Sequence, residues 1–353
     1  MKKSLALLTT SALSLSLVLA GCGGDSSSAD KGVVNVYNWG VYIDESVLED
    51  FTAETGIKVN YDIYESNESM YGVLKNDGAS YDVVIPSDYM ISRMIEEDML
   101  EPLNFNNIPN FADVDPALKN PDYDPENLYS VPYMWGLLGI IYNTTMVKET
   151  PTSWATMFDE NYAGQILMFN NSRDAIGVAL KYLGYSYNTT DPDQIKEAVD
   201  LLIQQKPLVQ SYVMDEIFEK MQGGSAAIGA YYYGDFLTMQ EINPDLAFCL
   251  PEEGTNLYVD AMCIPKNAEN KENAELFINY MCSTQAGLKN CEEIWYSSPL
   301  LSVREELDPE VSGDPYAYPD ESILANCESF KNLPADILAL YDDQWTRLML
   351  SSN

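Results

Sequence analysis

Hydrophobic positions in the first sixty residues after Gly32 follow two periods in alternation. Short runs that are apolar or alternate with polar residues predict strands, and longer segments with apolar residues three and four apart predict helices. The predicted strands are residues 33–39, 57–63 and 81–85, and the predicted helices are residues 45–55, 66–74 and 86–94. Asp44 is the expected cap of the first helix and Gly56 its end. This order predicts a mostly parallel sheet flanked by helices.

A second series of elements follows a weakly periodic stretch. Residues 105–129 are polar and rich in Pro and Asn, and residues 131–136 after them indicate a domain boundary. Further strands are predicted at 137–142, 166–169, 226–232, 246–250 and 257–262, and helices at 154–158, 175–183, 192–204, 216–221, 270–281 and 337–348. Asn270 is the expected cap of the helix that it begins. We expect a second α/β lobe, with the chain crossing back near residue 260.

Composition excludes several functions. The 353 residues carry a formal net charge of -36, which argues against nucleic acid as a partner, because phosphate contacts need basic patches. A solvated acidic surface that favours solubility explains most of this charge, although the charge would also attract a cationic ligand. The chain has no His, which removes Ser-His-Asp triads, Cys-His pairs and His-ligated metal sites. We expect no metal and no cofactor.

The amino terminus has the pattern of a targeting segment. Lys2 and Lys3 precede an apolar run, and the sequence Leu-Ala-Gly-Cys that ends at Cys22 resembles the lipobox of bacterial lipoproteins. This predicts a signal peptide over residues 1–21, a lipid on Cys22 and a flexible tether over 22–32. A secretory peptide cleaved elsewhere is the alternative, and the apolar run is short for a membrane span.

Five further cysteines are distributed without a metal-binding spacing. They are Cys249, Cys263, Cys282, Cys291 and Cys327. An odd number cannot all pair within one chain, so we expect buried free thiols with at most two disulfides.

Aromatic and acidic residues occur together at three predicted strand ends. These stretches are Trp39 to Asp44, Tyr231 to Asp235 and Tyr258 to Asp260. An alkylammonium ligand needs carboxylate acceptors for its charge and apolar or aromatic walls for its methylene stem. Taken singly, each stretch fits core Tyr with surface Asp equally well. A carboxylate pair could also serve a glycosidase, although sequence gives no separation.

Several longer motifs carry a family resemblance. They include Tyr37-Asn38-Trp39, Tyr81 to Ser87, Pro132 to Gly136, Asn188 to Pro192 and Ile264 to Ala268. Through nearly the whole mature chain, the sequence resembles the spermidine/putrescine-binding proteins, which are the extracytoplasmic receptors of polyamine ABC importers. The resemblance implies a two-lobed periplasmic-binding-protein fold of type II. Each lobe would be an α/β lobe with a mostly parallel sheet, and two crossing strands would form the hinge.

The resemblance also implies a division of the chain and a ligand site. Residues 33–135 and 258–310 would form lobe 1, residues 136–257 lobe 2, and residues 311–353 a helical segment packing across both lobes. The implied ligand-binding residues are Trp39, Tyr42, Ser87, Tyr89, Asp174, Tyr232, Asp235, Tyr258 and Asp260. The carboxylates would hold ammonium groups, the aromatic residues would wall the methylenes, and Ser87 and Tyr89 would add hydrogen bonds.

Two positions depart from the family pattern. Val41 stands where the family usually has an acid between the first-loop aromatics, and Asn171 stands where an Asp is frequent. Because an ammonium buried without its carboxylate is costly, these changes favour fewer or differently placed amines, and hence a diamine such as putrescine.

The expected function is that of a lipid-anchored, extracytoplasmic and monomeric receptor without enzymatic activity. It would capture putrescine or spermidine between its lobes and deliver the polyamine to an ABC permease with its ATPase. The alternatives are a sensor lipoprotein that docks on a signalling partner and an extracellular carbohydrate hydrolase.

Overall fold

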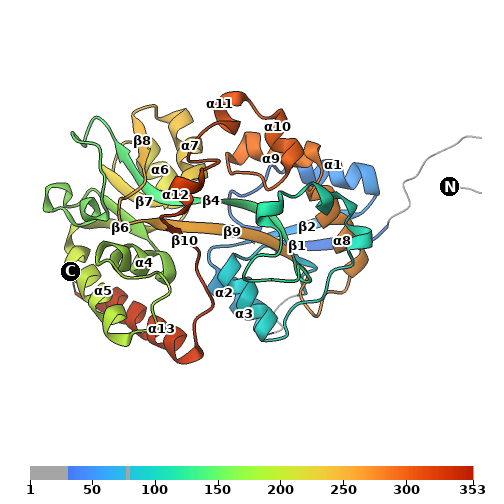
Figure 1. Ribbon diagram of the computed structural model, residues 1–353, viewed down its shortest axis with the longest axis horizontal. Coiled ribbons are helices and arrows are strands. Elements are labelled where there is room, and N and C mark those ends of the chain that lie inside the picture. Colours follow the sequence, from blue (N-terminus) through green and yellow to red (C-terminus); the bar gives the residue numbers. More distant parts are fainter. Residues whose placement is uncertain (1–30, 77–79, 353) are drawn as a thin grey trace, which may run out of the picture.

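The computed structural model describes residues 31–76 and 80–352. The expected signal peptide, Cys22 and most of the tether lie outside these residues. The described chain forms two α/β lobes joined by strands that run through both (Figure 1). None of its helices is long and apolar enough to cross a membrane.

Lobe 1 is built on a sheet with the strand order β2, β1, β3, β9 and β4. Its parallel strands are β1 (Val33–Trp39), β2 (Lys58–Tyr64) and β3 (Val83–Val84). The helices around them are α1 (Ser46–Thr55), α2 (Asn67–Lys75), α3 (Asp88–Glu96), α8 (Lys271–Met281) and α9 (Thr284–Ile294). Because successive strand residues face opposite sides, Val36 belongs to the core that includes α1 and α8, and Tyr37 to the core that includes α2 and α3.

Lobe 2 continues the sheet from β4 through β7, β5 and β6, with β8 beside β4. Its own strands are β5 (Ile166–Phe169), β6 (Val209–Val213), β7 (Ile228–Tyr232) and β8 (Leu246–Cys249). Its helices are α4 (Ser172–Tyr182), α5 (Pro192–Gln205), α6 (Glu216–Gln222), α7 (Tyr233–Ile242) and α13 (Ala335–Leu350). The pairs β5–β6 and β5–β7 are parallel, and β4 is antiparallel to β7 and β8.

Two long antiparallel strands connect the lobes. They are β4 (Ser130–Asn143) and β9 (Thr255–Cys263), in which Trp135 pairs with Val259. The first half of β4 pairs with β9, and its second half pairs with β7 and β8. The sheets of the two lobes therefore meet beside these two strands (Figure 1).

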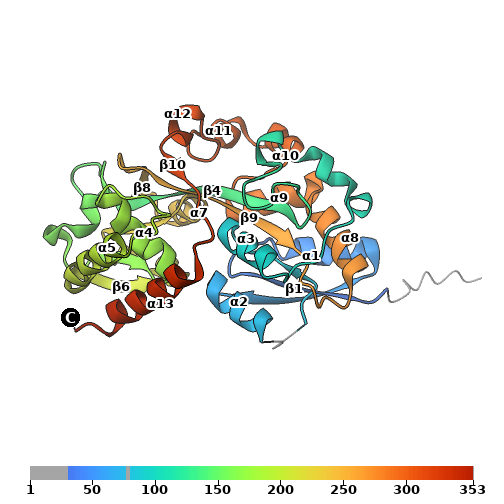
Figure 2. The ribbon, with the colours of Figure 1, turned by 60° about the horizontal axis from the view of Figure 1, so that its bottom comes forward.

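The carboxyl-terminal segment touches both lobes. After α10 (Leu301–Glu306) of lobe 1, it runs from the end of α11 (Pro309–Ser312) through α12 (Glu321–Leu324) and β10 (Cys327–Glu328) to α13. Cys327 pairs in parallel with Thr255 of β9, and α13 then packs along α4 and α5 of lobe 2 (Figure 2). Between these elements, the Phe330 ring contacts Tyr89 of lobe 1 and Tyr187 of lobe 2.

The structure corrects several sequence expectations. The strand predicted to begin at Leu137 begins at Ser130, and a register shift between Pro132 and Met134 accommodates the proline. The segment predicted as a helix at 154–158 is a 3-10 helix, as are 105–107, 109–113, 116–118, 160–162 and 206–208. Strand β6, helix α7 and the helices between α8 and α13 were not predicted from periodicity.

Two expected helix caps also differ. The carboxylate of Asp44 accepts a hydrogen bond from Ser46 N, but Glu45 occupies the cap position of α1. Asn270 occupies the cap position of α8, but its side chain donates to Asp82 rather than capping the helix. The five cysteines after the tether are free thiols, and only Cys327 is partly exposed.

Candidate functional site

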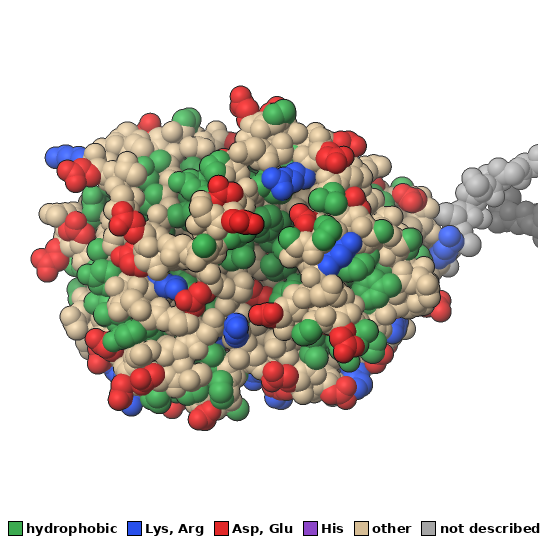
Figure 3. Space-filling view, in the orientation of Figure 1, with side chains coloured by type: hydrophobic (Ala, Val, Ile, Leu, Met, Phe, Trp, Pro, Cys, Tyr) green, Lys and Arg blue, Asp and Glu red, His purple; other side chains and the backbone are tan. Residues whose placement is uncertain are grey.

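A cavity of about 420 Å³ lies between the lobes, at the ends of their strands. Figure 3 shows Asp and Glu side chains on both lobes beside the hollow between them. The acids that line the cavity are Glu65, Glu68, Asp88, Asp174, Asp215, Glu216, Glu219, Asp235 and Asp260. None of the described residues that line it is Lys or Arg. The cavity therefore presents a strongly negative surface to its contents.

All nine residues expected to bind ligand line this one cavity. They come from β1 and the loop after it, from the start of α3, from the start of α4, from the β7–α7 junction and from β9. The structure brings these distant segments together because β9 lies beside both β3 and β4. Their contact with a ligand stays a prediction.

Asp260 is the acid on the lobe 1 side. It lies in β9, is 5% exposed, and accepts hydrogen bonds of 2.6 Å from the hydroxyls of Tyr42 and Ser87. Asn67 in turn donates to the Ser87 hydroxyl at 3.0 Å. Burial raises the pKa of Asp260 to about 6, because the ionised carboxylate loses water that two hydroxyls replace only in part.

Asp174 lies in the first turn of α4, on the lobe 2 side. Its Oδ2 accepts hydrogen bonds from the Tyr232 hydroxyl at 2.9 Å and from Asn171 Nδ2 at 2.7 Å. Asn171 is also the N-cap of α4, because its Oδ1 accepts from Asp174 N at 2.9 Å. Burial raises the pKa of Asp174 to about 6. An amide at position 171 thus donates to Asp174, which a second carboxylate could not do.

Asp235 is the third buried acid, in the first turn of α7. Its Oδ2 accepts a hydrogen bond of 2.8 Å from the Tyr296 hydroxyl. The Tyr296 ring packs directly on Gly234, where a Cβ atom would overlap with it, so glycine is needed there. Burial, assisted by the charge of Asp215, raises the pKa of Asp235 to about 8.

Aromatic rings form much of the remaining wall. Trp39 donates from Nε1 to the Ile85 carbonyl at 3.0 Å, which fixes its ring beside the Tyr64 ring. The rings of Tyr232 and Tyr258 meet edge to face, with centroids 5.1 Å apart. The aromatic surface is thus held in place by the protein before any ligand enters.

The two residues expected to add hydrogen bonds, Ser87 and Tyr89, are already engaged, and so is the hydroxyl of Tyr42. The hydroxyls of Tyr42 and Ser87 hold Asp260, and the Tyr89 hydroxyl donates to Glu68 at 2.8 Å. These side chains therefore position the carboxylates that face the cavity, rather than offering free hydroxyls. The guanidinium carbon of Arg173 lies 4.9 Å from the centroid of the Tyr89 ring.

Sequence reasoning missed several lining residues. The main ones are Tyr64, Glu65, Glu68, Asp215, Tyr231, Tyr296 and Phe330. Tyr231 belongs to the aromatic stretch Tyr231 to Asp235, whereas Tyr296 follows Trp295, which ends α9 with a left-handed φ of 60°. The period of hydrophobic residues along the sequence does not predict a turn of this kind.

The chemistry of the lining suits binding of a cation. Three carboxyl groups whose pKa values are raised by burial face the same cavity. A positive charge beside them would stabilise their ionised forms and lower these pKa values. Among the described residues, no group of His, Cys, Asp and Glu side chains is arranged to hold a metal ion.

Known proteins that this chain resembles are solute-binding proteins. The sequence pattern of the bacterial extracellular solute-binding protein family matches residues 46–318. The chain is 36% identical to the spermidine/putrescine-binding periplasmic protein of Salmonella typhimurium over 345 residues, 97% of each chain. It is 29% identical to a putrescine-binding periplasmic protein of Pseudomonas aeruginosa, over 95% of this chain and 96% of that one.

Solved structures agree with these sequence relatives. A spermidine/putrescine ABC transporter substrate-binding protein of Streptococcus pneumoniae superposes with a TM-score of 0.77 at 38% identity, covering 91% of this chain and 99% of that one. A lipoprotein of Treponema pallidum gives a TM-score of 0.78 at 26% identity, covering 90% and 99%. The expected two-lobed fold is confirmed, and none of these names describes a sensor or a hydrolase.

Proposed function

The chain belongs to the family of bacterial extracellular solute-binding proteins, and on this basis we propose that it is the polyamine receptor of an ABC import system. The observation that carries this proposal is the set of three buried carboxylates, Asp174, Asp235 and Asp260, facing one aromatic-walled cavity. Its relatives are solute-binding proteins, and the chain is a binding protein without catalytic activity of its own.

The physical argument rests on replacing water around an ammonium group. A primary ammonium that leaves water needs charged acceptors, and each desolvated carboxylate contact is worth more than a neutral hydrogen bond. Ring faces add about 0.5 to 2 kcal/mol per ammonium and exclude water from the methylene stem. Trp39, Tyr42, Tyr232 and Tyr258 wall the stem, and Ser87 and Tyr89 hold the acids in position. This combination favours putrescine or spermidine over amino acids, whose carboxylates would be repelled.

The cellular setting follows from the same proposal. The protein acts outside the cytoplasmic membrane as a monomer tethered by a lipid on Cys22, and it delivers its ligand to a permease coupled to an ATPase. Residues 33–135 with 258–310 and residues 136–257 are the two lobes that close over the ligand, while the carboxyl-terminal segment packs across them.

Calorimetric titration tests the proposal. The purified protein is titrated with putrescine, spermidine, agmatine and a set of amino acids. We expect micromolar or tighter binding of at least one amine, about 8 kcal/mol or more, and no binding of amino acids. If no amine binds more tightly than about 1 mM, equivalent to about 4 kcal/mol, the proposed function is wrong.

Val41 provides a test of ligand choice. Its side chain lines the cavity, is 59% exposed and has a φ of 47°, which is unfavourable for a β-branched residue. Val41→Glu restores an acid where the family usually has one and relieves that strain. We expect spermidine affinity to rise about 5-fold relative to putrescine, since the longer amine has a third ammonium to place. Val41→Gln is the control of the same shape, and an unchanged affinity ratio for Val41→Glu would mean that Val41 is a neutral replacement.

A further inference from the structure

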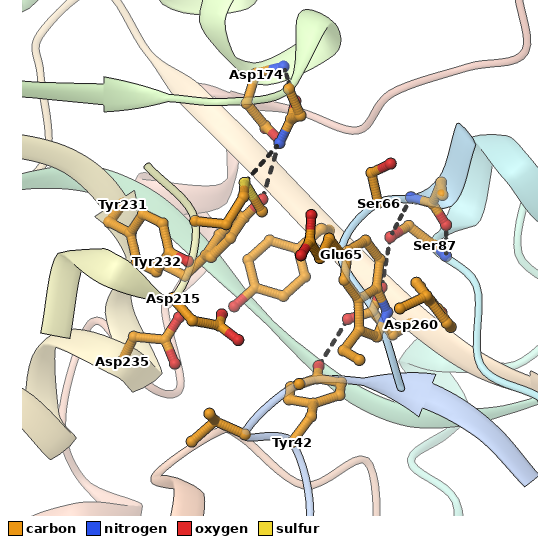
Figure 4. Close-up of a pocket in the computed structure, with 18 of the residues that line it drawn as sticks. Tyr42, Glu65, Ser66, Ser87, Asp174, Asp215, Tyr231, Tyr232, Asp235 and Asp260 are labelled. Carbon is orange, nitrogen blue, oxygen red and sulfur yellow. Dashed lines mark hydrogen bonds between the residues drawn. The ribbon is translucent and has the colours of Figure 1, made fainter. Parts of the chain in front are cut away.

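One corner of the cavity, formed by Asp215, Tyr231 and Asp235, has more acceptors than its neighbours can satisfy. Asp215 immediately precedes α6, Tyr231 lies in β7, and Asp235 lies in the first turn of α7. Figure 4 shows the three side chains on the same side of the cavity, across from Asp260. The charge of Asp215 acts on both Asp235 and Tyr231, which agrees with this proximity. We call this group the Asp215 corner.

The hydroxyl of Tyr231 reaches the cavity surface and has no partner among the described residues. Its side chain is 2% exposed, yet its hydroxyl makes no hydrogen bond to any described residue and lines the cavity. The ring cannot readily turn away, because it stacks on Phe169 with centroids 5.3 Å apart and planes 18° apart. A hydroxyl that reaches the cavity from a ring held in this way is available as an acceptor for a donor of the ligand.

The two carboxylates of the corner also have free oxygens. Asp235 is 8% exposed, and only its Oδ2 is engaged, by Tyr296, which leaves Oδ1 without a donor among the described residues. Neither carboxylate oxygen of Asp215 accepts a hydrogen bond or ion pair from the described chain, and the residue is exposed, so water solvates it until a ligand enters. Loss of hydration, with the charges of Glu216 and Glu65, raises the pKa of Asp215.

Asp215 reaches the cavity at the line where the lobes meet. Its carboxylate lies so close to Gly40 of lobe 1 that a Cβ atom at position 40 would overlap with it. A glycine after Trp39 therefore makes room for an acid from the opposite lobe. The neighbouring position in lobe 1 is Val41, so the acid beside the first loop is supplied by lobe 2.

We propose that Asp215 and Tyr231 join Asp235 in a subsite for a primary ammonium terminus, which makes Asp215 a determinant of ligand choice. A primary ammonium has three N–H donors, and the corner offers three free acceptors, namely Asp235 Oδ1, the Asp215 carboxylate and the Tyr231 hydroxyl. This inference rests on the proposed function and extends it by naming the groups that take one end of the amine.

Single substitutions measured by calorimetry with putrescine and spermidine test the subsite. Asp215→Asn should weaken binding of putrescine about 10-fold, because it removes the charge of one acceptor, and Tyr231→Phe about 3-fold, because it removes a neutral acceptor. Tyr231→Phe breaks no hydrogen bond of the fold, so its stability should be unchanged. Asp245→Asn is the matched control, since Asp245 is exposed on lobe 2 outside the cavity, and it should bind within 2-fold of the wild type.

A double-mutant cycle separates direct contact from a general charge effect. Gly40→Ala should weaken binding about 5-fold by displacing the Asp215 carboxylate, and it should have little effect in an Asp215→Ala background, where nothing is displaced. Equal effects of Gly40→Ala in both backgrounds would place Asp215 outside the subsite.

The failure of this inference differs from failure of the proposed function. If the wild type binds putrescine while Asp215→Asn and Tyr231→Phe bind it equally well, the subsite is wrong and polyamine binding stands. If Asp215→Asn binds more tightly, Asp215 only repels the opposite lobe, and the subsite is again wrong. If the wild type binds no amine, both the proposed function and the subsite are wrong.

Discussion

Asp260→Asn is expected to weaken polyamine binding at least 100-fold. Asp260 is the acid on the lobe 1 side, and its carboxylate is oriented by Tyr42 and Ser87, which come from separate loops. The replacement keeps the shape of the side chain and removes the charge opposite a desolvated ammonium, so about 2.7 kcal/mol or more of binding free energy is lost. Calorimetry with putrescine and spermidine measures the loss.

Stability of the ligand-free variant distinguishes this loss from misfolding. Burial disfavours the ionised Asp260 carboxylate in the empty cavity, so Asp260→Asn should unfold at the same temperature as the wild type or slightly above it. Thermal unfolding followed by circular dichroism gives this comparison, with Asp245→Asn again as the control. Binding within 3-fold of the wild type would remove Asp260 from the ligand site.

Affinity for amines is expected to fall by about 1,000-fold or more between pH 8 and pH 5.5. Burial raises the pKa of Asp235 to about 8 and the pKa values of Asp174 and Asp260 to about 6. Ammonium groups bind the ionised carboxylates, so each carboxyl that is protonated in the free receptor must first lose its proton. Lowering the pH through 8 and then through 6 therefore weakens binding in two stages.

Proton release gives a second readout of the same linkage. Near pH 7, binding should release about one proton, mainly from Asp235, and calorimetry in buffers of different ionisation enthalpy measures it. Asp235→Asn should abolish this release and leave only the stage near pH 6. A flat pH profile with no proton released would contradict the assignment of these carboxyls to the ligand site.

The same raised pKa values affect the empty protein with the opposite sign. For each of these carboxyls the folded pKa lies above the unfolded value, so its contribution to stability is fully present below about pH 4. That contribution is lost as the pH rises through 6 for Asp174 and Asp260, and through 8 for Asp235. The stabilisation by putrescine should therefore be largest on the alkaline side.

Local signals explain why much of the site could be predicted from sequence. Trp39 ends a short apolar strand that can be read from a two-residue period, and strand ends in α/β folds gather at one edge, although Asp260 lies inside β9 and not at a strand end as expected. The pairing of a ring with a carboxylate at these ends then indicates a cation. The family resemblance selected Asp174, which no strand end marks, since it lies inside α4.

The remaining features depend on contacts that only tertiary structure creates. The sequence around Pro132 and Gly136 predicts a domain boundary, but in the structure both residues lie inside β4, which crosses between the lobes. The local sequence around Tyr296 and Asp215 gives no indication that either residue lines a cavity. They line it in the structure, where Tyr296 follows a left-handed residue and a glycine of the other lobe admits Asp215.

The distribution of acids over both lobes affects how this receptor selects its ligand. Asp260 is held by lobe 1 through Tyr42 and Ser87, whereas Asp174 and Asp235 belong to lobe 2. A molecule with two cationic ends can attach to one lobe and then meet the other intramolecularly, at a high effective concentration, as a chelator does. A monoamine has no second end with which to bridge the lobes. Discrimination against monoamines would then arise from the closure step itself, and a rejected amine would leave before the lobes come together.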